Sequence, residues 1–588
     1  MINNKIDNIL KEFASVKTRR TLWENIWELI ARYVIARKQG FNKPSNQPDF
    51  YLHGDVYDDT APLALNQMVS SLTGALWKGA RRTVRLVKPE NVPETTEIKE
   101  YYTEINRRLA LQMDHPKAGF ITSFQEYMTE NGAFGTSGLG VFPSKPGSEH
   151  LVDYRAIGLK FLWIVEDARG RVAKIFYEVR LNAFQLIEEY GDVAKTDDVM
   201  AAIETNNYDK LFPVLWLIRP RTQYNPAIKN NQNMPYQSIH ILEDAKIQLK
   251  DTGFKELPIK VTRFYKNEGE EYGRSPSHES LPSIIEINAL WEMITKAGEK
   301  KLSPPLWLLD DGTFGGGIID TSPDALNVLD SSSRITSGAP IGVIGDVGDP
   351  AWALKLIEAL TNQVTKHYFV DRLLDLNNQT RMTFGEAQIR NELRADSLGG
   401  VYNRQIDECL TPVVQRTVGI LVDAGEFGVA AGSAEEAGLK AADLPILYVP
   451  EDIVAADAVG TEIYNIEYIS PALRILRSEE LRGVMSTWQF AGGFAQFAPE
   501  FMLMLDKEKS MKLVAELSGA TSDIFLSKEK YEKELADFRE AQQANAQMAQ
   551  QQSQAEAAAK VASANQQNAQ AQATTQGASG MPGGDVPL

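Results

Sequence analysis

A short polar segment, residues 376–382 (LNNQTRM), lies between two stretches that both predict helices. Its side-chain amides and its one cation can contact phosphate oxygens without gripping them as strongly as a run of lysines would. The candidate contact residues are Asn377, Asn378, Gln379 and Arg381. The alternative is an ordinary interhelical loop, in which asparagine is common.

Two groups of cations are further candidates. Four lysines, Lys296, Lys300, Lys301 and Lys366, fall on predicted helices over 277–302 and 351–375. They form cationic belts or, as is more common for such lysines, a solvated helix face or pairs with the neighbouring Glu299 and Glu358. A second group, Lys78, Arg81, Arg82, Arg85 and Lys88, has no acid between its members. It is either a nucleic-acid patch or, as we expect in so acidic a chain, a site of pairing between subunits or a solvated face.

No catalytic residue, metal or cofactor is predicted. The segment 312–317 (GTFGGG) lacks the Lys-Ser/Thr pair of a phosphate-binding loop. Cys409 is the single cysteine, it falls on an apolar stripe, and none of the six histidines has zinc-helix spacing. No run of about 18 apolar residues predicts a membrane span. The net charge of −17 argues against tight sequence-specific DNA binding, but a conduit through which DNA slides does not need such binding.

The first half of the chain predicts an α+β domain. Helices are expected over 3–38, 60–77, 101–113 and 120–131, and the first shows an apolar stripe through Leu22, Ile26, Leu29, Ile30 and Tyr33. From Gly138 the period becomes strand-like. The expected strands are 139–142, 161–166, 172–180, 212–220, 236–243 and 258–265, with a hairpin turn over 167–170 and a single helix over 184–190.

The second half is mostly helical. In the helix over 277–302, Ile284, Ile287, Trp291 and Ile294 are spaced 3, 4, 3, which is typical of a helix that packs lengthwise on neighbours. A glycine-rich insert over 303–350 suits a compact β-rich element, and the next helix has one apolar face. That face comprises Ala353, Ile357, Leu360, Val364 and Tyr368.

A capping box at 383–386 (TFGE) starts a third helix, which we expect to be perturbed at Gly399-Gly400 and at Pro412 before it ends near 424. Helical pieces follow within 473–526. The segment 529–575 has neither glycine nor proline. Small residues recur in it at alternating intervals of three and four positions, which is typical of the contact face of a packed helix. The alternative is a disordered low-complexity tail. Residues 577–588 are expected to be flexible.

Several motifs, in this order, resemble the portal (head-to-tail connector) proteins of short-tailed, T7-like bacteriophages. The most specific is 269–276, in which Gly269-Glu270 precedes the run YGRSP; the next is Met382-Thr383 with Glu386, Arg390 and the downstream residues to Pro412. The turn 131–138 (NGAFGTSG) and the segments 57–61 and 72–76 also match. One departure is 80–86, which is basic here, where such proteins tend to have a proline and an aromatic residue.

The resemblance implies a portal fold with an α/β wing, a two-helix stem, a small clip insert and a helical C-terminal crown or barrel. The implied parts are the wing 1–276, stem helices 277–302 and 351–375, clip 303–350, channel loop 376–382, long wing helix with its following segment 383–470, crown 471–528, barrel or disordered segment 529–576 and flexible tail 577–588. It also implies a homo-dodecameric ring at one capsid vertex of the virion, assembled in the host cytoplasm, with double-stranded DNA in its channel. The implied protein partners are the large subunit of the terminase motor, the major capsid and scaffolding proteins, and tail adaptor proteins. No membrane is involved.

Two other classes compete with this interpretation. One is another virion structural protein, such as a tail adaptor or a coat subunit, which would form rods or shells. The other is an enzyme on nucleic acid, which would need a nucleotide-binding loop or a carboxylate metal cluster, and the sequence indicates neither.

Overall fold

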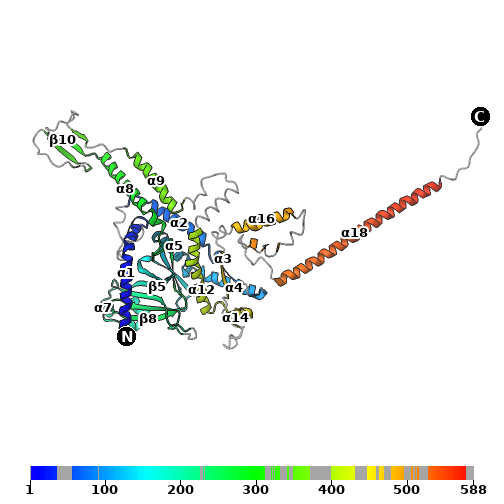
Figure 1. The fold of residues 1–588 in the computed structure, drawn as a ribbon, viewed down its shortest axis with the longest axis horizontal. Coiled ribbons are helices and arrows are strands. Elements are labelled where there is room, and N and C mark those ends of the chain that lie inside the picture. The colour runs from blue at the N-terminus through cyan, green and yellow to red at the C-terminus, as the bar shows by residue number, and fades with distance from the viewer. Residues whose placement is uncertain are drawn as a thin grey trace, which may run out of the picture.

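The computed structural model describes residues 2–35, 41, 56–89, 92–93, 95–225, 230, 232–310, 320, 322–323, 325–330, 341–343, 349–370, 399–430, 447–458, 463–468, 478–494, 505–506, 510–511, 513–515 and 528–577. An α+β body carries a projecting pair of helices on one side and a single long helix on the other (Figure 1). The fold class is therefore α+β, as predicted.

The N-terminal part of the body contains the helices α1 Ile2–Tyr33, α2 Thr60–Leu76, the single turn α3 Ala80–Thr83, α4 Thr96–Met113 and α5 Phe120–Phe134. The apolar face predicted for α2 is buried. The stripe predicted for α1 is wrong at three positions, because Leu22 is 78% exposed and Ile26 and Leu29 are also exposed, whereas Ile30 is buried and Tyr33 is partly buried, as predicted. The buried stripe instead runs through Ile6, Ile9, Phe13, Val16, Trp27 and Ile30.

The larger sheet is an antiparallel meander in the order β4-β5-β6-β7-β8. Its strands are β4 Leu162–Glu166, β5 Val172–Asn182, β6 Leu211–Pro220, β7 Tyr236–Leu242 and β8 Ile247–Phe254. Alternate residues of β6 face opposite sides. Leu215 and Leu217 therefore pack under α1, whereas Phe212 and Val214 pack with α6 Ala183–Tyr190 and α7 Asp197–Glu204.

The smaller sheet, in the order β3-β2-β9, lies against α5. It comprises β2 Thr136–Pro143, β3 Val152–Ile157 and β9 Ile259–Arg263. The six predicted strands and the 167–170 turn are confirmed, but β3, β8 and α7 were not predicted. These three segments are short or strongly polar, so their periodicity is weak, and neighbouring strands or helices decide their conformation.

The projecting pair consists of α8 Pro276–Leu302 and α9 Ala351–His367, which pack on each other. Both helices were predicted, and all five residues of the apolar face expected on the second are buried. At its tip lies a three-stranded sheet with β10 Leu306–Asp310 between β11 Leu326–Asp330 and β12 Ile341–Val343. The β-rich insert is thus confirmed in the described residues. Residues 371–398, which include the predicted capping box, lie outside them.

The C-terminal half returns to the body before leaving it. A π-helical turn, Ile406–Leu410, leads into α12 Thr411–Asp423, so the predicted perturbation near Pro412 takes the form of an extra residue in the helix. Two short strand pairs involve the chain after α12. The first is antiparallel and joins β1 Val84–Val87 to β15 Asn465–Tyr468, and the second is parallel and joins β13 Val429–Ala430 to β14 Tyr448–Val449. The helix α14 Glu451–Ala458 follows β14.

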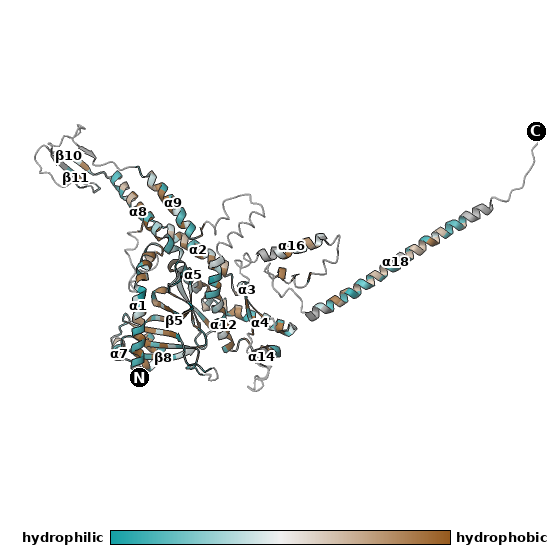
Figure 2. Ribbon diagram, in the orientation of Figure 1, coloured by the Kyte–Doolittle hydropathy of each residue, from teal (hydrophilic) through white to brown (hydrophobic). Residues whose placement is uncertain are grey.

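The last described elements are α16 Ser478–Phe494 and α18 Lys528–Gly577. α18 is one continuous helix, and the residues of its predicted seam, Ala541, Ala544, Met548, Gln551, Ala555, Ala558 and Ala562, are all exposed. Figure 2 shows hydrophobic and hydrophilic residues mixed along α18, whereas hydrophobic residues gather on the strands of the body. The helical alternative for this segment is confirmed, and its packing against other helices stays a prediction.

Two glycine turns, more than 130 residues apart in the sequence, cross in the body. Gly135 ends α5 in the left-handed region, with φ of 78°. A methyl group on Gly273 would overlap the carbonyl oxygen of Gly135 and come within 2.7 Å of Cβ of Arg263. The backbone N–H of Gly273 also donates to Oγ1 of Thr136 at 2.8 Å. Only glycine allows the two main chains to approach this closely.

We expect Gly273→Ala to lower the free energy of unfolding by about 2–3 kcal/mol, because the added methyl overpacks a backbone crossing. Gly74→Ala in α2 is the matched control. No atom outside its own helix would lie within 4 Å of that methyl, so we expect a gain of about 0.5–1 kcal/mol from helix propensity. Urea unfolding followed by circular dichroism measures both, and equal effects from the two substitutions would contradict the close crossing.

Candidate functional site

The helix pair α8–α9 with its tip sheet is the candidate functional element, because it leaves the body and holds four of the predicted site residues. α8 is 27 residues long and therefore spans about 40 Å. Its start is defined by Ser275 at the N-cap, whose carbonyl accepts from the backbone N–H of His278 at 3.0 Å, and by Pro276 in the first turn. The backbone N–H of Ser275 donates to Nδ1 of His278 at 3.2 Å. Burial lowers the pKa of His278 to about 4, so the ring is neutral and can accept this bond.

The base of the helix pair is tied to α5 at one point. The hydroxyl of Ser277 donates to the carbonyl of Gly132 at 3.2 Å and lies 2.8 Å from the hydroxyl of Tyr368, which follows the end of α9. Ser275 Oγ donates to the carbonyl of Ala133 at 2.6 Å. Both helices of the pair are therefore held by the last turn of α5. Ser275 and the carbonyls of Gly132 and Ala133 belong to motifs that the sequence had singled out, and Tyr368 lies on the predicted apolar face, but Ser277 was not singled out and the contacts among these residues could not be identified without the fold.

Further along the pair, α8 is held by the segment before α2. The backbone N–H of Tyr57 donates to the side-chain oxygen of Asn288, which is buried, at 2.7 Å. Ile284 and Ile287 are fully buried, and Trp291 and Ile294 are partly buried against the same core. The seam predicted for this helix is confirmed as a packing face within the chain.

The four predicted lysines lie on this pair but do not form one cluster of equivalent groups. Lys296 is exposed and pairs with Glu292 one turn away at 2.6 Å, and that carboxylate raises the pKa of Lys296. Glu292 was not among the acidic neighbours, Glu299 and Glu358, that the sequence suggested for these lysines. Lys301 and Lys366 are exposed, and Lys300 is half-exposed. Asn377, Asn378, Gln379 and Arg381 lie outside the described residues, so the DNA-contacting loop stays a prediction.

Where α9 ends, the backbone makes an unusual turn. Phe369 has φ of 57°, a left-handed conformation that is rare for an aromatic residue. Its side chain is partly buried against the body core, which holds the turn. The described part of this segment ends directly after this turn, at residue 370.

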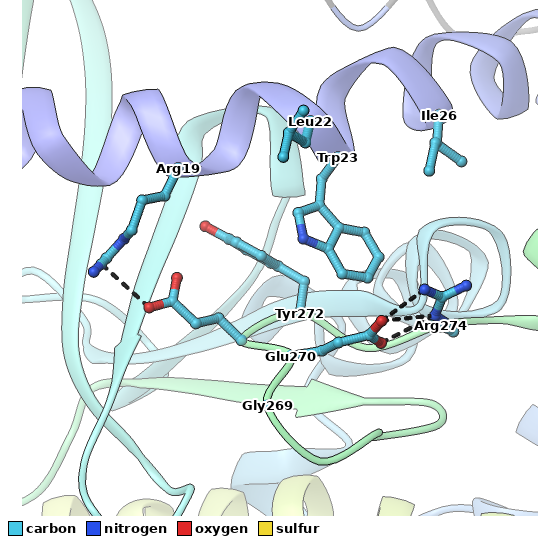
Figure 3. Close-up of a pocket in the computed structure, with 9 residues that line it drawn as sticks. Arg19, Leu22, Trp23, Ile26, Gly269, Glu270, Tyr272 and Arg274 are labelled. Atoms are coloured by element: carbon cyan, nitrogen blue, oxygen red, sulfur yellow. Dashed lines mark hydrogen bonds and ion pairs between the residues drawn. The ribbon is translucent and has the colours of Figure 1, made fainter.

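The motif 269–274 forms the outer side of a groove of about 480 Å³ against α1 (Figure 3). Glu271 pairs with Arg19 at 3.2 Å, and Glu270 pairs with Arg274 at 2.6 Å. The Arg274 guanidinium lowers the pKa of Glu270, whereas burial raises that of Glu271. The side chain of Trp23 lies between these two ion pairs in the close-up. The charges of the groove are thus already paired, which indicates a joint between α1 and the motif and not a reaction site.

The helix that follows the predicted loop is tied to the body by buried polar contacts at its π turn. The amide of Gln405 accepts from the hydroxyl of Tyr127 at 2.7 Å and donates to Asn131 at 2.8 Å. Glu408 accepts from the backbone N–H of Arg263 at 3.1 Å. Asn131 belongs to a motif that the sequence had singled out, but its partner Gln405 could not be identified without the fold.

The described residues that resemble catalytic sets do not have catalytic geometry. Ser144 Oγ lies 3.0 Å from Nε2 of His150, and Asp153 lies 2.6 Å from the same nitrogen. A catalytic triad needs the nucleophile and the carboxylate on opposite ring nitrogens. Burial raises the pKa of Cys409 to about 12, so it is a core thiol, as predicted. The described residues contain no group of three or more potential metal ligands, and none of their helices is long and apolar enough to cross a bilayer.

Comparisons with known proteins find a family and two relatives that match this chain. The sequence profile of the family described as bacteriophage head to tail connecting protein matches residues 7–526. The portal protein of Salmonella phage epsilon15 is 22% identical over 565 residues, which cover 95% of each chain. The probable portal protein of Bordetella phage BPP-1 is 24% identical over 427 residues, which cover 71% of this chain and 74% of that protein.

The match covers α1 and the body, the helix pair with its tip sheet, the helix after the predicted loop, and α16. The resemblance drawn from the motifs is thereby confirmed. The chain belongs to the bacteriophage head to tail connecting protein family.

Proposed function

We propose that the chain is one subunit of a phage portal, a ring at one capsid vertex through which double-stranded DNA is packaged, retained and ejected. Family membership and the two portal relatives support the portal role. As a portal it is a structural component of the virion at the junction of head and tail. The ring is a homo-dodecamer in this proposal, and it hydrolyses nothing, because the packaging motor supplies the work.

The parts of the ring map onto the observed elements. The body up to residue 276 is the wing, α8 and α9 are the stem, and the β10–β12 sheet is the clip. The loop 376–382 faces the channel, with Asn377, Asn378, Gln379 and Arg381 toward DNA, and α12 ends the long wing helix. The segment 471–528, with α16, is the crown, and α18 contributes to a helical barrel. In this arrangement Lys300, Lys301 and Lys366 lie along the bore.

The clip is the docking surface for other proteins. It binds the large subunit of the terminase motor during packaging and tail adaptor proteins afterwards, whereas the wing contacts the major capsid protein and scaffolding proteins. The sheet is suited to this task because it lies at the far tip of the stem (Figure 1).

One observation carries the proposal: the stem leaves large apolar side chains uncovered. Met293 on α8 is 63% exposed and Trp352 on α9 is 66% exposed, although α8 and α9 bury their other apolar faces against each other and the body. A two-helix hairpin cannot cover its own outer faces. A second copy of the chain beside the hairpin would cover these faces. Head-to-tail contacts between identical subunits close into a ring when the rotation between neighbours allows it.

Electron microscopy of the purified protein tests the proposal. We expect rings of one size with a central hole as wide as a DNA duplex. Rods or shells would instead support another virion structural role, such as a tail adaptor or coat subunit. Robust nucleotide hydrolysis by the pure protein would support an enzyme on nucleic acid.

The paired substitution Met293→Asp and Trp352→Asp is expected to abolish rings and leave folded monomers, because each carboxylate would be buried without a partner between subunits. Asn362→Asp, at an exposed position of α9, adds a charge on the same helix and is the control that should still assemble. Sedimentation velocity gives the assembly state, and thermal unfolding confirms the fold. Rings of normal size from the paired variant would place these two side chains in solvent.

Replacing Asn377, Asn378, Gln379 and Arg381 together with alanine is expected to leave rings intact and to reduce DNA retention, because the loop could no longer bind phosphate oxygens. Nuclease protection of the packaged genome measures retention, and electron microscopy checks the rings. If the variant forms no rings, the loop is a structural connection, and its proposed role in the channel is wrong.

A further inference from the structure

The basic run of the sequence is divided by the fold into paired and unpaired cations. Arg85 lies in β1 directly opposite Glu467 of β15, and Lys88 Nζ donates to the carbonyl of Val92 at 2.8 Å. The other three, Lys78, Arg81 and Arg82, are exposed. Their side chains form no ion pair or hydrogen bond with any residue in the described part of the chain. We name these three residues the cationic corner.

The cationic corner is held on a rigid support. Trp77 is buried, and its ring centroid lies 4.4 Å from that of Phe120. The backbone N–H of Lys78 donates to Oγ1 of Thr83 at 3.0 Å, and Thr83 is fully buried. Asp114 accepts from the backbone N–H of Ala80 with both oxygens, at 2.9 and 3.0 Å. This carboxylate is therefore already hydrogen-bonded to the main chain of the support and leaves the three cations available to a partner.

The chemistry of the exposed surface favours a phosphate backbone as the partner. The apolar side chains of this segment, Trp77, Ala80 and Val84, are all buried, so its exposed side chains are the three cations. The core of a protein–protein interface is enriched in apolar and aromatic groups. Arginine and lysine side chains are common contacts to phosphate oxygens, and they need no apolar surroundings to make them. The chain as a whole carries a net charge of −17, so an unpaired cationic corner is a local exception to its repulsion of DNA.

The position of the corner indicates which DNA it meets. α3 belongs to the body, where it contacts α4, whereas the β10–β12 sheet lies at the far tip of the projecting helix pair (Figure 1). If that sheet faces the motor and the tail, the body that carries α3 lies toward the head. We propose that the cationic corner binds the backbone of double-stranded DNA outside the channel, so that packaged DNA lies against the outer surface of the ring. This inference rests on the proposed function.

Covalently closed, relaxed circular DNA separates this binding from the channel, because a closed circle has no end to thread through an assembled ring. Binding of such circles to purified rings is measured over a salt series. We expect the variant Lys78→Gln, Arg81→Gln, Arg82→Gln to bind more weakly. The slope of log K against log salt concentration should fall by about 0.9 for each phosphate that the variant no longer neutralises, or about 2.7 for each subunit that touches the circle.

The matched control is Lys117→Gln, Lys145→Gln, Lys195→Gln. It makes the same change in net charge at three exposed lysines, but these pair with Glu149, Glu188 and Asp192. Its affinity for circles should stay within about twofold of the wild-type value. Thermal unfolding checks that both variants are folded, and Arg81→Gln, Arg82→Gln is the reserve if the triple variant is not.

Three results would overturn the inference. The first is equal binding of circles by the wild type and the corner variant. The second is an equal weakening in the control variant, which would indicate a general charge effect. The third is failure of ring assembly in the corner variant alone, which would make the corner an interface between subunits. If the wild type forms no rings, the proposed function fails by itself, and the same comparison on monomers with circular DNA still tests the corner.

Discussion

The close crossing of Gly135 and Gly273 is the constraint on which the arrangement of this molecule depends. One glycine ends α5, and the other lies three residues before α8, so their crossing sets where the stem begins relative to the wing. Since neither residue has a side chain, the two main chains are as near as van der Waals radii allow. Hydrogen bonds from Gly273, Ser275 and Ser277 then lock the start of α8 onto the segment 132–136.

The same point also receives the end of α9, through Tyr368 and Ser277. The stem is therefore a hairpin that is held by the body at its base and along one side of α8, and that leaves its outer faces exposed. Such an element suits a subunit of an assembly: its direction is determined by the fold of one chain, and its outer faces are left for neighbours. The contacts within one chain account for the buried apolar face of α9. The outer faces, which that chain cannot cover, carry the exposed Met293 and Trp352.

Buried polar groups inside the body join its elements. Arg20 occupies a core position on α1, where it donates to the carbonyls of Leu162 and Lys160 at 2.7 and 3.0 Å and pairs with Glu24 at 2.9 Å. It therefore fastens α1 to the first strand of the larger sheet. Buried charges of this kind hold a unique arrangement only if every partner is present, which is consistent with a rigid structural protein.

The sequence by itself determined the elements whose signals are local. Proline and serine mark the start of α8, the spacing of five apolar residues marks the buried face of α9, and Asp167 to Gly170 mark a hairpin turn. The function was predicted from the family resemblance, because the motifs occur in this sequence in the same order as in a known family. Periodicity was insufficient for α1, which has apolar residues on two faces and could bury either.

Only the tertiary structure decided which face of α1 is covered and which cations are paired. It also explained why two of the motifs contain a glycine turn, because Gly135 and Gly273 lie against each other. A helix pattern specifies which residues share a face, but the partner that covers that face comes from a distant part of the chain. Leu22 is exposed and Arg20 is buried because the sheet lies on one side of α1 and not on the other. Likewise, Arg85 lies opposite an acid whereas Arg82 has no partner among the described residues, because β15, from more than 370 residues later, pairs with the strand that carries Arg85.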